Sequence, residues 1–395
     1  MAERAQAFDV IVIGAGAAGL MCALTAGQRG RKVLLLEHTD KAGAKILISG
    51  GGRCNFTNLA TNPKCFVSDN PHFCTSALKR YTQTDFIALV EKHGIAYHEK
   101  TLGQLFCDGS ARAIIAMLQA ECAAGSVDLR LGCSVSHVSK PDHFRLETNI
   151  GIFTAPSIVL ATGGLSIPKM GATGFSYDVA KTFGLRLTKT FPGLVPVKVA
   201  SQSSFFDTAL AGVSLDAIAS FEKQSFRANI LFTHRGLSGP AILQISSYWR
   251  QGGTITLDLA PDIDVKAFLN ERKRARPRTT VQTILAEILP SRLAQALAAA
   301  HMPKGEMANI PDQKLADLAN ELKSWRVRPE GTEGYAKAEV TCGGIDTREL
   351  SSKTMEALRV PGLYAIGEAV DVTGWLGGYN FQWAWSSGWS AGQAV

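Results

Sequence analysis

One glycine-rich turn constrains the fold of this chain more than any other feature. The turn reads Gly14-Ala-Gly16-Ala-Ala-Gly19 and follows an apolar run over 8–13 that we expect to be a buried β-strand. A helix is expected over 17–29, and a second apolar strand over 33–37. Strand, helix and strand within roughly thirty residues form the βαβ unit of a parallel sheet. The sequence therefore predicts a Rossmann-type dinucleotide-binding fold.

Each glycine of the turn has its own role in such a fold. Gly14 permits the tight turn, Gly16 lets a pyrophosphate approach the backbone, and Gly19 allows the helix to pack closely against the strand. The pyrophosphate is expected at the amides of Ala17 and Ala18, because a helix N-terminus favours negative charge.

Three further segments extend the nucleotide-binding pattern. Glu37 ends the second strand, where its carboxylate is expected to bind the adenosine ribose hydroxyls. A buried strand expected over 158–161 ends in the small residues Ala161-Thr162-Gly163. A third apolar strand leads into Gly367-Glu368. Together with the glycine turn, the segments at 158–163 and 367–368 follow the order seen in the two-dinucleotide-binding-domain flavoproteins, and this resemblance implies FAD rather than NAD.

Two glycine-rich segments suit backbone that packs against a flat ring or a phosphate. The first runs from Gly50 through Gly52 to Arg53, Cys54 and Asn55, and Lys45 lies shortly before it. Arg53 can pair with an anion or a reduced flavin. The second segment, 374–382, leads into a helix expected over 383–394. The N-terminus of that helix would stabilise negative charge on a flavin pyrimidine ring.

The chain resembles the BaiN/YhiN-like flavoproteins, also labelled aminoacetone oxidase family FAD-binding enzymes. The stretches that carry the resemblance are GGGRCNFTN, LFTHRGLSGPAIL, AEVTCGGI, GLYAIGEAVDVTG and GGYNFQWAWSSG. They are spread over nearly the whole chain. The resemblance implies an α/β fold, with an FAD-binding domain of the two-dinucleotide-binding-domain type interrupted by a β-barrel-like and a helical insertion.

The resemblance also implies roles for single residues. The backbone of Val135 would contact adenine. Positions that would line the FAD are Arg53, Cys54, Asn55, Glu368, Asn380 and Phe381. Two departures from the family pattern are Ala44, in place of a basic residue before Lys45, and Trp375-Leu376, in place of a smaller pair. The second departure leaves the size of the substrate open.

Together, the motifs and the resemblance define one expected cofactor site and no metal site. Its residues are Gly14, Gly16, Ala17, Ala18, Gly19, Glu37, Lys45, Gly52, Arg53, Cys54, Asn55, Val135, Ala161, Thr162, Gly163, Gly367, Glu368, Gly378, Asn380 and Phe381.

The expected domains follow the change of character along the chain. The FAD-binding domain is expected over 1–192 and 336–395, the β-barrel-like insert over 193–262 and 324–335, and the helical insert over 263–323. Within the helical insert, Thr279 and Gln282 fit a capping box. Asp312 is expected to cap its last helix.

Charge and cysteine spacing bear on partners and location. A net charge of +7 suits anions in general, and on a chain of 395 residues it does not favour a nucleic-acid partner. The eight cysteines include no C-x-x-C pair, so we expect free thiols in the cytoplasm. No apolar stretch reaches the ~18 residues that a membrane-spanning helix needs.

Several residues allow both a structural and a functional interpretation. His234 belongs to a turn and is also the one candidate for a catalytic acid or base. Cys54 is more often structural than a redox partner of the flavin. The basic run 272–278 fits a solvated face, or contact with nucleic acid or anionic lipid. Three tryptophans share part of a helical face and are expected in the core: Trp383, Trp385 and Trp389.

The sequence predicts an FAD-dependent oxidoreductase that transfers hydride at flavin N5, with a small organic molecule as substrate. Two reactions stay open, namely NAD(P)H-linked reduction of a conjugated double bond and oxidation of a small amine. No second G-x-G-x-x-G turn accompanies a βαβ unit, so NAD(P)H would act as a transient electron donor. Two other classes are a flavin-dependent protein that modifies or binds nucleic acid, docked through the basic helical insert, and a flavin-bound sensor. The oligomeric state stays open.

Overall fold

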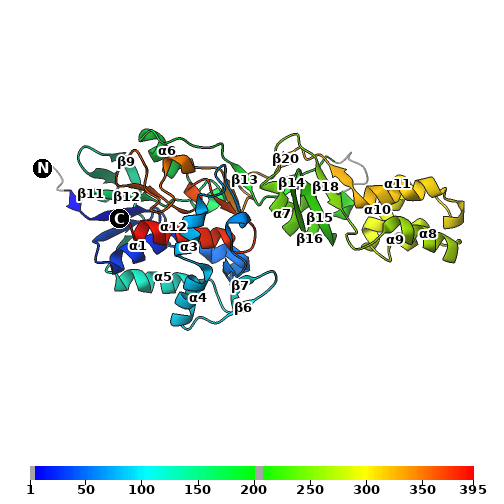
Figure 1. The fold of residues 1–395 in the computed structure, drawn as a ribbon, viewed down its shortest axis with the longest axis horizontal. Coiled ribbons are helices and arrows are strands. Elements are labelled where there is room, and N and C mark those ends of the chain that lie inside the picture. Colours follow the sequence, from blue (N-terminus) through cyan, green and yellow to red (C-terminus); the bar gives the residue numbers. More distant parts are fainter. Residues whose placement is uncertain (1–4, 201–207) are drawn as a thin grey trace. The chain divides into compact units, whose positions relative to one another are not determined.

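The chain divides into two compact units. The computed structural model describes residues 5–200 and 208–395. One unit comprises Met1–Phe191 and Val340–Val395, and we call it the two-segment unit. The other comprises Pro192–Glu339, and we call it the inserted unit. In Figure 1 the two-segment unit carries both the blue and the red ends of the colour scale, because segments from both sides of the insertion build it.

A five-stranded sheet forms the centre of the two-segment unit, with the strand order β22-β12-β2-β3-β8. Neighbouring strands are parallel throughout. The inner strands are continuous apolar runs because both faces of a parallel sheet are covered. The expected Rossmann-type fold is thereby confirmed. In sheet order, the strands are Leu363–Ala365, Ser157–Leu160, Val10–Ile13, Val33–Leu36 and Asp128–Arg130.

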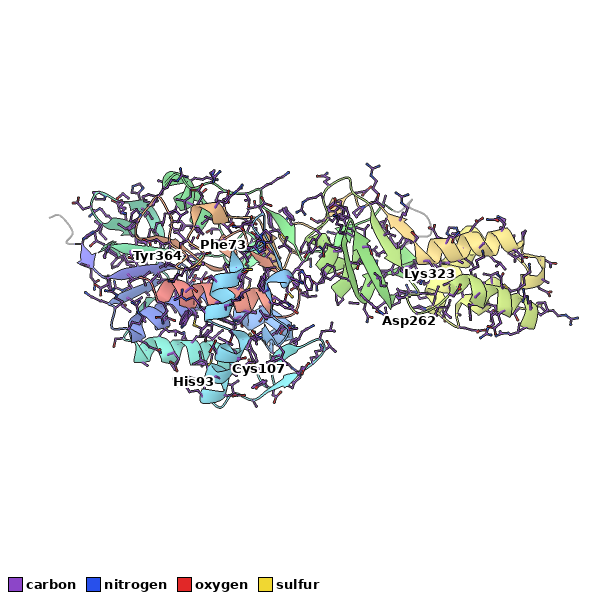
Figure 2. All side chains as sticks on the ribbon, in the orientation of Figure 1. Phe73, His93, Cys107, Asp262, Lys323 and Tyr364 are labelled. Carbon is purple, nitrogen blue, oxygen red and sulfur yellow. The ribbon has the colours of Figure 1, made fainter. Side chains whose placement is uncertain are left out.

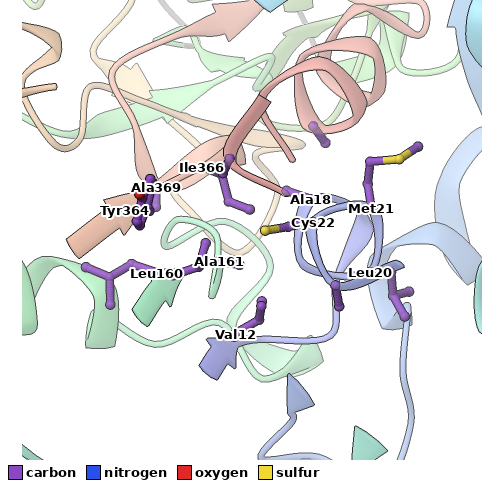
Figure 3. Close-up of a cluster of buried hydrophobic side chains, with 14 of the residues drawn as sticks. Val12, Ala18, Leu20, Met21, Cys22, Leu160, Ala161, Tyr364, Ile366 and Ala369 are labelled. Carbon is purple, nitrogen blue, oxygen red and sulfur yellow. The ribbon is translucent and has the colours of Figure 1, made fainter. Parts of the chain in front are cut away.

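Helices α1 (Ala17–Gln28) and α12 (Tyr379–Gly392) pack closely on each other. A Cβ added at Gly388 would lie 2.5 Å from the Ala18 carbonyl oxygen, and one at Gly392 would lie 2.7 Å from that of Cys22. Only glycine permits so short an approach of two helix backbones. Figure 3 shows the adjoining core, where Ala18 and Cys22 of α1 lie beside Ile366.

The tryptophans of α12 follow the prediction in part. Trp383 and Trp385 are fully buried, and Trp385 stacks on Phe86 with 4.3 Å between ring centroids. Trp389 is half-buried and stacks on Tyr81. The first two are therefore core residues, as expected, while the third lies at the edge of the core.

Smaller elements complete the two-segment unit. One four-stranded sheet has the order β1-β11-β10-β9, with bounds Gln6–Ala7, Gly151–Ala155, Phe144–Thr148 and Val135–Ser139. A three-stranded sheet has the order β4-β7-β6, with bounds Asn55–Asn58, Gln104–Cys107 and Tyr97–Glu99. The remaining helices are α2 (Ala44–Ile48), α3 (Cys74–Arg80), α4 (Gln83–Lys92), α5 (Arg112–Ala124) and α6 (Phe175–Thr182). The remaining strands are β5 (Phe66–Val67), β21 (Val340–Cys342) and β23 (Thr373–Gly374).

The inserted unit combines an antiparallel sheet with helices. The sheet has the order β19-β18-β15-β16-β17-β14-β20, with bounds Trp325–Val327, Ile255–Asp258, Ser214–Phe221, Gln224–Phe232, Gly236–Ser238, Val197–Lys198 and Gly331–Thr332. The helices are α7 (Pro240–Ser246), α8 (Val265–Ala275), α9 (Val281–Leu285), α10 (Ser291–His301) and α11 (Asp312–Lys323). Sheet and helices share one hydrophobic core. Lys323, labelled in Figure 2, joins α11 to β18 because its Nζ lies 2.7 Å from the Asp258 carboxylate.

Two predicted helix caps in the inserted unit are wrong. The cap of α9 is Thr280, whose side chain accepts a hydrogen bond from the Thr283 amide. The backbone of Thr279 is held elsewhere, since its carbonyl accepts from the Met307 amide. Asp312 is the first residue of α11, after Pro311 at the cap. The Asp312 carboxylate instead contacts the Lys273 ammonium at 2.7 Å, because a residue already inside the helix is not placed to cap it.

Candidate functional site

The glycine turn between β2 and α1 has two glycines that the protein itself requires and one that it does not. A Cβ added at Gly14, where φ is +106°, would lie 2.6 Å from the Ala161 carbonyl oxygen. A Cβ added at Gly19 would overlap the Gly14 carbonyl oxygen. Gly16 has an ordinary φ of −78°, and a Cβ added there would meet nothing within 4 Å. Gly16 therefore faces open space, which suits close approach of a ligand.

The first turn of α1 offers free amides beside that space. Gly16 is the N-cap residue and has no side chain with which to cap the helix. The amides of Ala17 and Ala18 at the start of α1 are therefore available to an anion, and the helix dipole favours negative charge there.

Glu37 is fixed next to the glycine turn. Its Oε2 accepts a hydrogen bond from the Ala15 amide at 3.0 Å, and its Oε1 accepts from the Thr39 amide at 3.0 Å. His38 Nδ1 also lies 3.0 Å from Oε1. The carboxylate is thus held in one orientation at the end of β3. A ribose contact of this carboxylate stays a prediction.

The half-buried carboxylate of Glu368 brings four segments together at the other end of the site. The Glu368 carboxylate accepts from Lys45 Nζ at 2.7 Å, from Ser166 Oγ at 2.6 Å and from the Thr341 amide at 2.9 Å. Burial alone would raise the pKa of Glu368, but Lys45 and these hydrogen bonds outweigh burial and hold the pKa below its usual range. Glu368 is therefore a fixed anion with a paired cation.

The second and third motifs meet the glycine turn and this carboxylate. Gly163 has a φ of +75°, and a Cβ added there would lie 4.0 Å from Glu368 Oε2. Gly367 has a φ of +63°, and a Cβ added there would lie 2.8 Å from the Cβ of Ala18. Thr162 Oγ1 is 2.6 Å from the Ser176 hydroxyl. The structure therefore gathers the three predicted nucleotide-binding segments in one place.

The segment before β4 is an unusual run of left-handed backbone. Gly50, Gly51, Gly52 and Cys54 have φ values of +56°, +67°, +85° and +51°. Arg53 is exposed, and no hydrogen bond or ion pair engages its side chain within the described residues. Cys54 is fully buried, and burial raises the pKa of its thiol to about 12. A buried thiol with so high a pKa is a poor redox nucleophile, which favours the structural interpretation of Cys54.

The start of α12 is shaped by glycine and by amide side chains. Gly378, with a φ of +97°, is its N-cap and has no side-chain cap, so the first amides of the helix are free. Asn380 uses its own amide within the preceding loop, where it donates to and accepts from Gly374 at 2.8 Å. Phe381 stacks on Trp385 with 5.6 Å between centroids. Asn380 and Phe381 therefore fix this helix start from within.

Two expected site residues belong to other segments of the chain than the residues above. Val135 begins β9 and pairs with Thr148 in the four-stranded sheet. His234 belongs to the inserted unit, where it is exposed in the turn between β16 and β17. Roles for both in cofactor or substrate contact stay predictions.

The structure adds site residues that sequence reasoning missed. Ser166 and Thr341 hold Glu368, and Gln104 lies 3.3 Å from the Asn55 side chain. The only sequence signals were positional, since Ser166 follows the second motif closely and Thr341 lies in the AEVTCGGI stretch.

These residues fit an FAD molecule. Two uncapped helix N-termini suit the pyrophosphate and the flavin pyrimidine ring. Open space beside Gly16 and Gly51 leaves room where a side chain would otherwise stand. The acids Glu37 and Glu368 lie at the ends of β3 and β22, where ribose and ribityl hydroxyls would find acceptors.

Comparison with known proteins gives a consistent family. A family model described as HI0933-like protein Rossmann domain matches residues 8–394. A protein named ribosomal RNA dihydrouridine synthase from Escherichia coli is 52% identical, over 98% of both chains. One of the same name from Haemophilus influenzae is 45% identical over 99% of both. A 3-dehydro-bile acid delta(4,6)-reductase from Clostridium scindens is 29% identical over 97% of this chain and 98% of that protein.

Solved structures share the fold at low sequence identity. A quinol-fumarate reductase matches with a TM-score of 0.53 and 17% identity, covering 99% of this chain and 71% of that one. A 3-ketosteroid dehydrogenase from Rhodococcus jostii matches with a TM-score of 0.50 and 16% identity, covering 99% of this chain and 98% of that one.

In the described residues, no helix combines the length and apolar character needed to cross a membrane.

Proposed function

The chain is an FAD-dependent oxidoreductase of the HI0933-like Rossmann-domain family, and from that premise we propose that it reduces uridine to dihydrouridine in ribosomal RNA. The observation that carries this proposal is the 52% identity, over 98% of both chains, to the E. coli protein of that name. The identity therefore extends over the sequence of both units rather than over one motif.

The sequence predicted two separate activities, reduction of a conjugated double bond and modification of nucleic acid. Reduction of uridine in RNA combines them, because the C5=C6 bond of uracil is conjugated with its C4 carbonyl group. The expectation against a nucleic-acid partner rested on the modest net charge and on the interpretation of the basic run 272–278 as a solvated face, and the names of the two relatives argue against it. Oxidation of a small amine finds no support in these names.

The reaction balances with a nicotinamide donor. NAD(P)H gives up a hydride, and uracil gains a hydride at C6 and a proton at C5. FAD, when bound, supplies the two-electron chemistry between donor and acceptor. NAD(P)H is proposed as a transient visitor, since the one G-x-G-x-x-G turn with a βαβ unit belongs to the FAD site.

The residues of the chain would bind, orient and polarise the cofactor. Amides of Ala17 and Ala18 would hold the pyrophosphate, and Glu37 would accept the adenosine ribose hydroxyls. Lys45 keeps Glu368 ionised in a half-buried position, so that this carboxylate remains an acceptor at neutral pH. The free amides after Gly378 would stabilise negative charge on the pyrimidine ring.

Anaerobic turnover with defined RNA tests the proposal. The holoprotein is mixed with NADPH or NADH and with E. coli ribosomal RNA transcribed in vitro, which contains no dihydrouridine. Nucleoside mass spectrometry should then find a uridine heavier by two hydrogen atoms at a discrete site. If the nicotinamide reduces the flavin but neither this RNA nor ribosomal RNA from cells lacking the modification gains dihydrouridine, the proposal is wrong. Reoxidation of the flavin by a conjugated steroid ketone instead would favour a small-molecule reductase.

A further inference from the structure

The end of α8 and the loop after it concentrate positive charge in the inserted unit. Five of the seven residues over 272–278 are cationic, and we call them the α8 basic cluster: Arg272, Lys273, Arg274, Arg276 and Arg278. A helix C-terminus favours cations in its last turn, which accounts for the first three. Arg276 and Arg278 lie beyond the last residue of α8, so the helix dipole does not account for them.

Nearby carboxylates neutralise only part of this cluster. Glu287 contacts both Arg272, at 2.8 Å, and Arg276. Asp312 contacts Lys273 at 2.7 Å. Arg274 and Arg278 are exposed, and over residues 5–200 and 208–395 no carboxylate lies within ion-pair distance of either. Arg274 and Arg278 are thus without a carboxylate partner in the described chain, while Glu287 and Asp312 hold the neighbouring cations in place.

The backbone that carries the cluster is well anchored. Asp264 caps the start of α8 by accepting from the Ala267 amide at 3.0 Å. After the helix, the Ala308 amide donates to the Pro277 carbonyl at 2.9 Å, and the Met307 amide donates to Thr279 at 2.8 Å. A fixed backbone lowers the entropy cost of presenting charged side chains to a partner.

We propose that the α8 basic cluster is a docking surface for the phosphate backbone of folded ribosomal RNA, with Arg274 and Arg278 as its phosphate contacts. This inference rests on the proposed function and names the part of the chain that holds the substrate. Arginine suits phosphate because its planar fork can donate two parallel hydrogen bonds.

The surroundings of the cluster fit RNA better than a lipid surface. A helix that lies on a membrane needs exposed large apolar side chains beside its cations. The large hydrophobic residues that are exposed in the described chain are Ile48, Leu59, Leu102, Leu131, Ile150 and Leu358. All six belong to the two-segment unit, and none lies near α8 in the sequence.

The test compares two charge-matched double variants of the holoprotein. In Arg274→Gln/Arg278→Gln, the proposed phosphate contacts are lost. In Lys198→Gln/Lys223→Gln, two exposed cations of the same unit are lost elsewhere, one in β14 and one in the turn between β15 and β16. Binding to E. coli ribosomal RNA transcripts is followed by fluorescence anisotropy between 50 and 300 mM KCl, with ~150 mM as the reference. Retained flavin absorbance and an unchanged melting temperature show that each variant is folded.

The arginine variant should bind about tenfold more weakly at the reference salt, and the slope of log Kd against log salt should fall by roughly 1.4. The lysine variant should change Kd less than about twofold. Arg274→Lys/Arg278→Lys should restore most of the salt slope, since a point charge still releases a counterion. Equal losses in both glutamine variants would show a mere net-charge effect and overturn the proposal.

Failure of this inference is separable from failure of the proposed function. If the wild type forms dihydrouridine while the arginine variant binds RNA unchanged, the docking surface is wrong and the function stands. If the wild type binds RNA through the cluster yet forms no dihydrouridine, the function is wrong and the surface stands. Binding to phosphatidylserine vesicles that competes with RNA and is lost in the arginine variant would assign the cluster to a membrane instead.

Discussion

The Lys45 ammonium lies 2.7 Å from the Glu368 carboxylate, although 323 positions separate the two residues in sequence. Lys45 belongs to α2 and Glu368 follows β22, so the pair joins the two segments of the two-segment unit. Glu368 also accepts hydrogen bonds from Ser166 and Thr341, so three partners hold its carboxylate in place.

Removing the cation of this pair should cost stability. We expect Lys45→Met to lower the free energy of unfolding by about 1–2 kcal/mol, because it leaves the Glu368 carboxylate without its paired cation. The loss stays this small because the Lys45 side chain is 33% exposed, so water already weakens the ion pair. The double variant Lys45→Met/Glu368→Gln should recover much of that loss. Urea unfolding of the apoprotein measures the free energy of unfolding of both variants. Lys181→Met, which removes an exposed ion pair with Asp178, should change stability by less than ~0.5 kcal/mol.

Substitution of Gly16 should separate cofactor binding from folding. In Gly16→Ala the new methyl group meets no protein atom within 4 Å and φ is already −78°, so the apoprotein should unfold within ~0.5 kcal/mol of the wild type. FAD affinity, measured by fluorescence titration, should fall at least roughly tenfold, because the methyl group would stand where the pyrophosphate approaches. Equal FAD affinity in wild type and variant would contradict the site.

Gly19→Ala is the matched control for packing. A Cβ there would overlap the Gly14 carbonyl oxygen, so this variant should lose stability even without FAD. We therefore expect Gly16→Ala to lose FAD affinity but not stability, and Gly19→Ala to lose stability even in the apoprotein.

The buried carboxylate of Glu121 should make stability depend on acid pH. Burial acts to raise the pKa of Glu121, but hydrogen bonds from Lys92, His93 and Gln28 outweigh burial and lower it to about 2. The stabilisation is complete above the ordinary pKa near 4.5, and it should be lost as pH falls through about 2. Guanidinium unfolding should show Glu121→Gln about 3 kcal/mol less stable at pH 6, with the gap closing toward pH 2. A gap that is the same at every pH would refute this reasoning.

Asp371 should have the opposite pH dependence. Burial, together with the nearby Asp69 charge, raises the pKa of its carboxyl to about 6, although the Asp69 amide donates to it. The folded state therefore resists ionisation, and its stability should fall as pH rises from about 4 through 6. Asp371→Asn should be about 2 kcal/mol more stable than the wild type at pH 7.5 and show no such gain at pH 4. Thermal melts check this, with exposed Asp142→Asn as a variant that should show no gain at either pH.

Most of the fold could be predicted because its signals are local. The strand before the glycine turn and the helix after it end within a few residues of their expected bounds, since apolar runs and a helix period are written in consecutive residues. The helix caps at Thr279 and Asp312 were wrong for an equally local reason. Adjacent threonines and a Pro-Asp pair each offer two positions for a cap, and backbone contacts made elsewhere decide between them.

The site could be predicted only as a set of segments. Its glycines follow a spacing, so Gly14, Gly16 and Gly19 were found directly. Two partners of Glu368 were not found, because Ser166 and Thr341 lie in segments far from Glu368 in sequence that only the folded chain brings to it. A single sequence also could not predict that the Asn380 side-chain amide forms hydrogen bonds with the backbone of Gly374.

The strand order has a consequence for synthesis on the ribosome. Strand β22 is the last to join the parallel sheet, beside β12, and α12 is the last helix to cover α1. The inserted unit, with a core of its own, is translated completely before either of them emerges. The flavin cradle of a nascent chain is therefore incomplete until β22 and α12 have emerged, which happens only after the whole inserted unit has been translated.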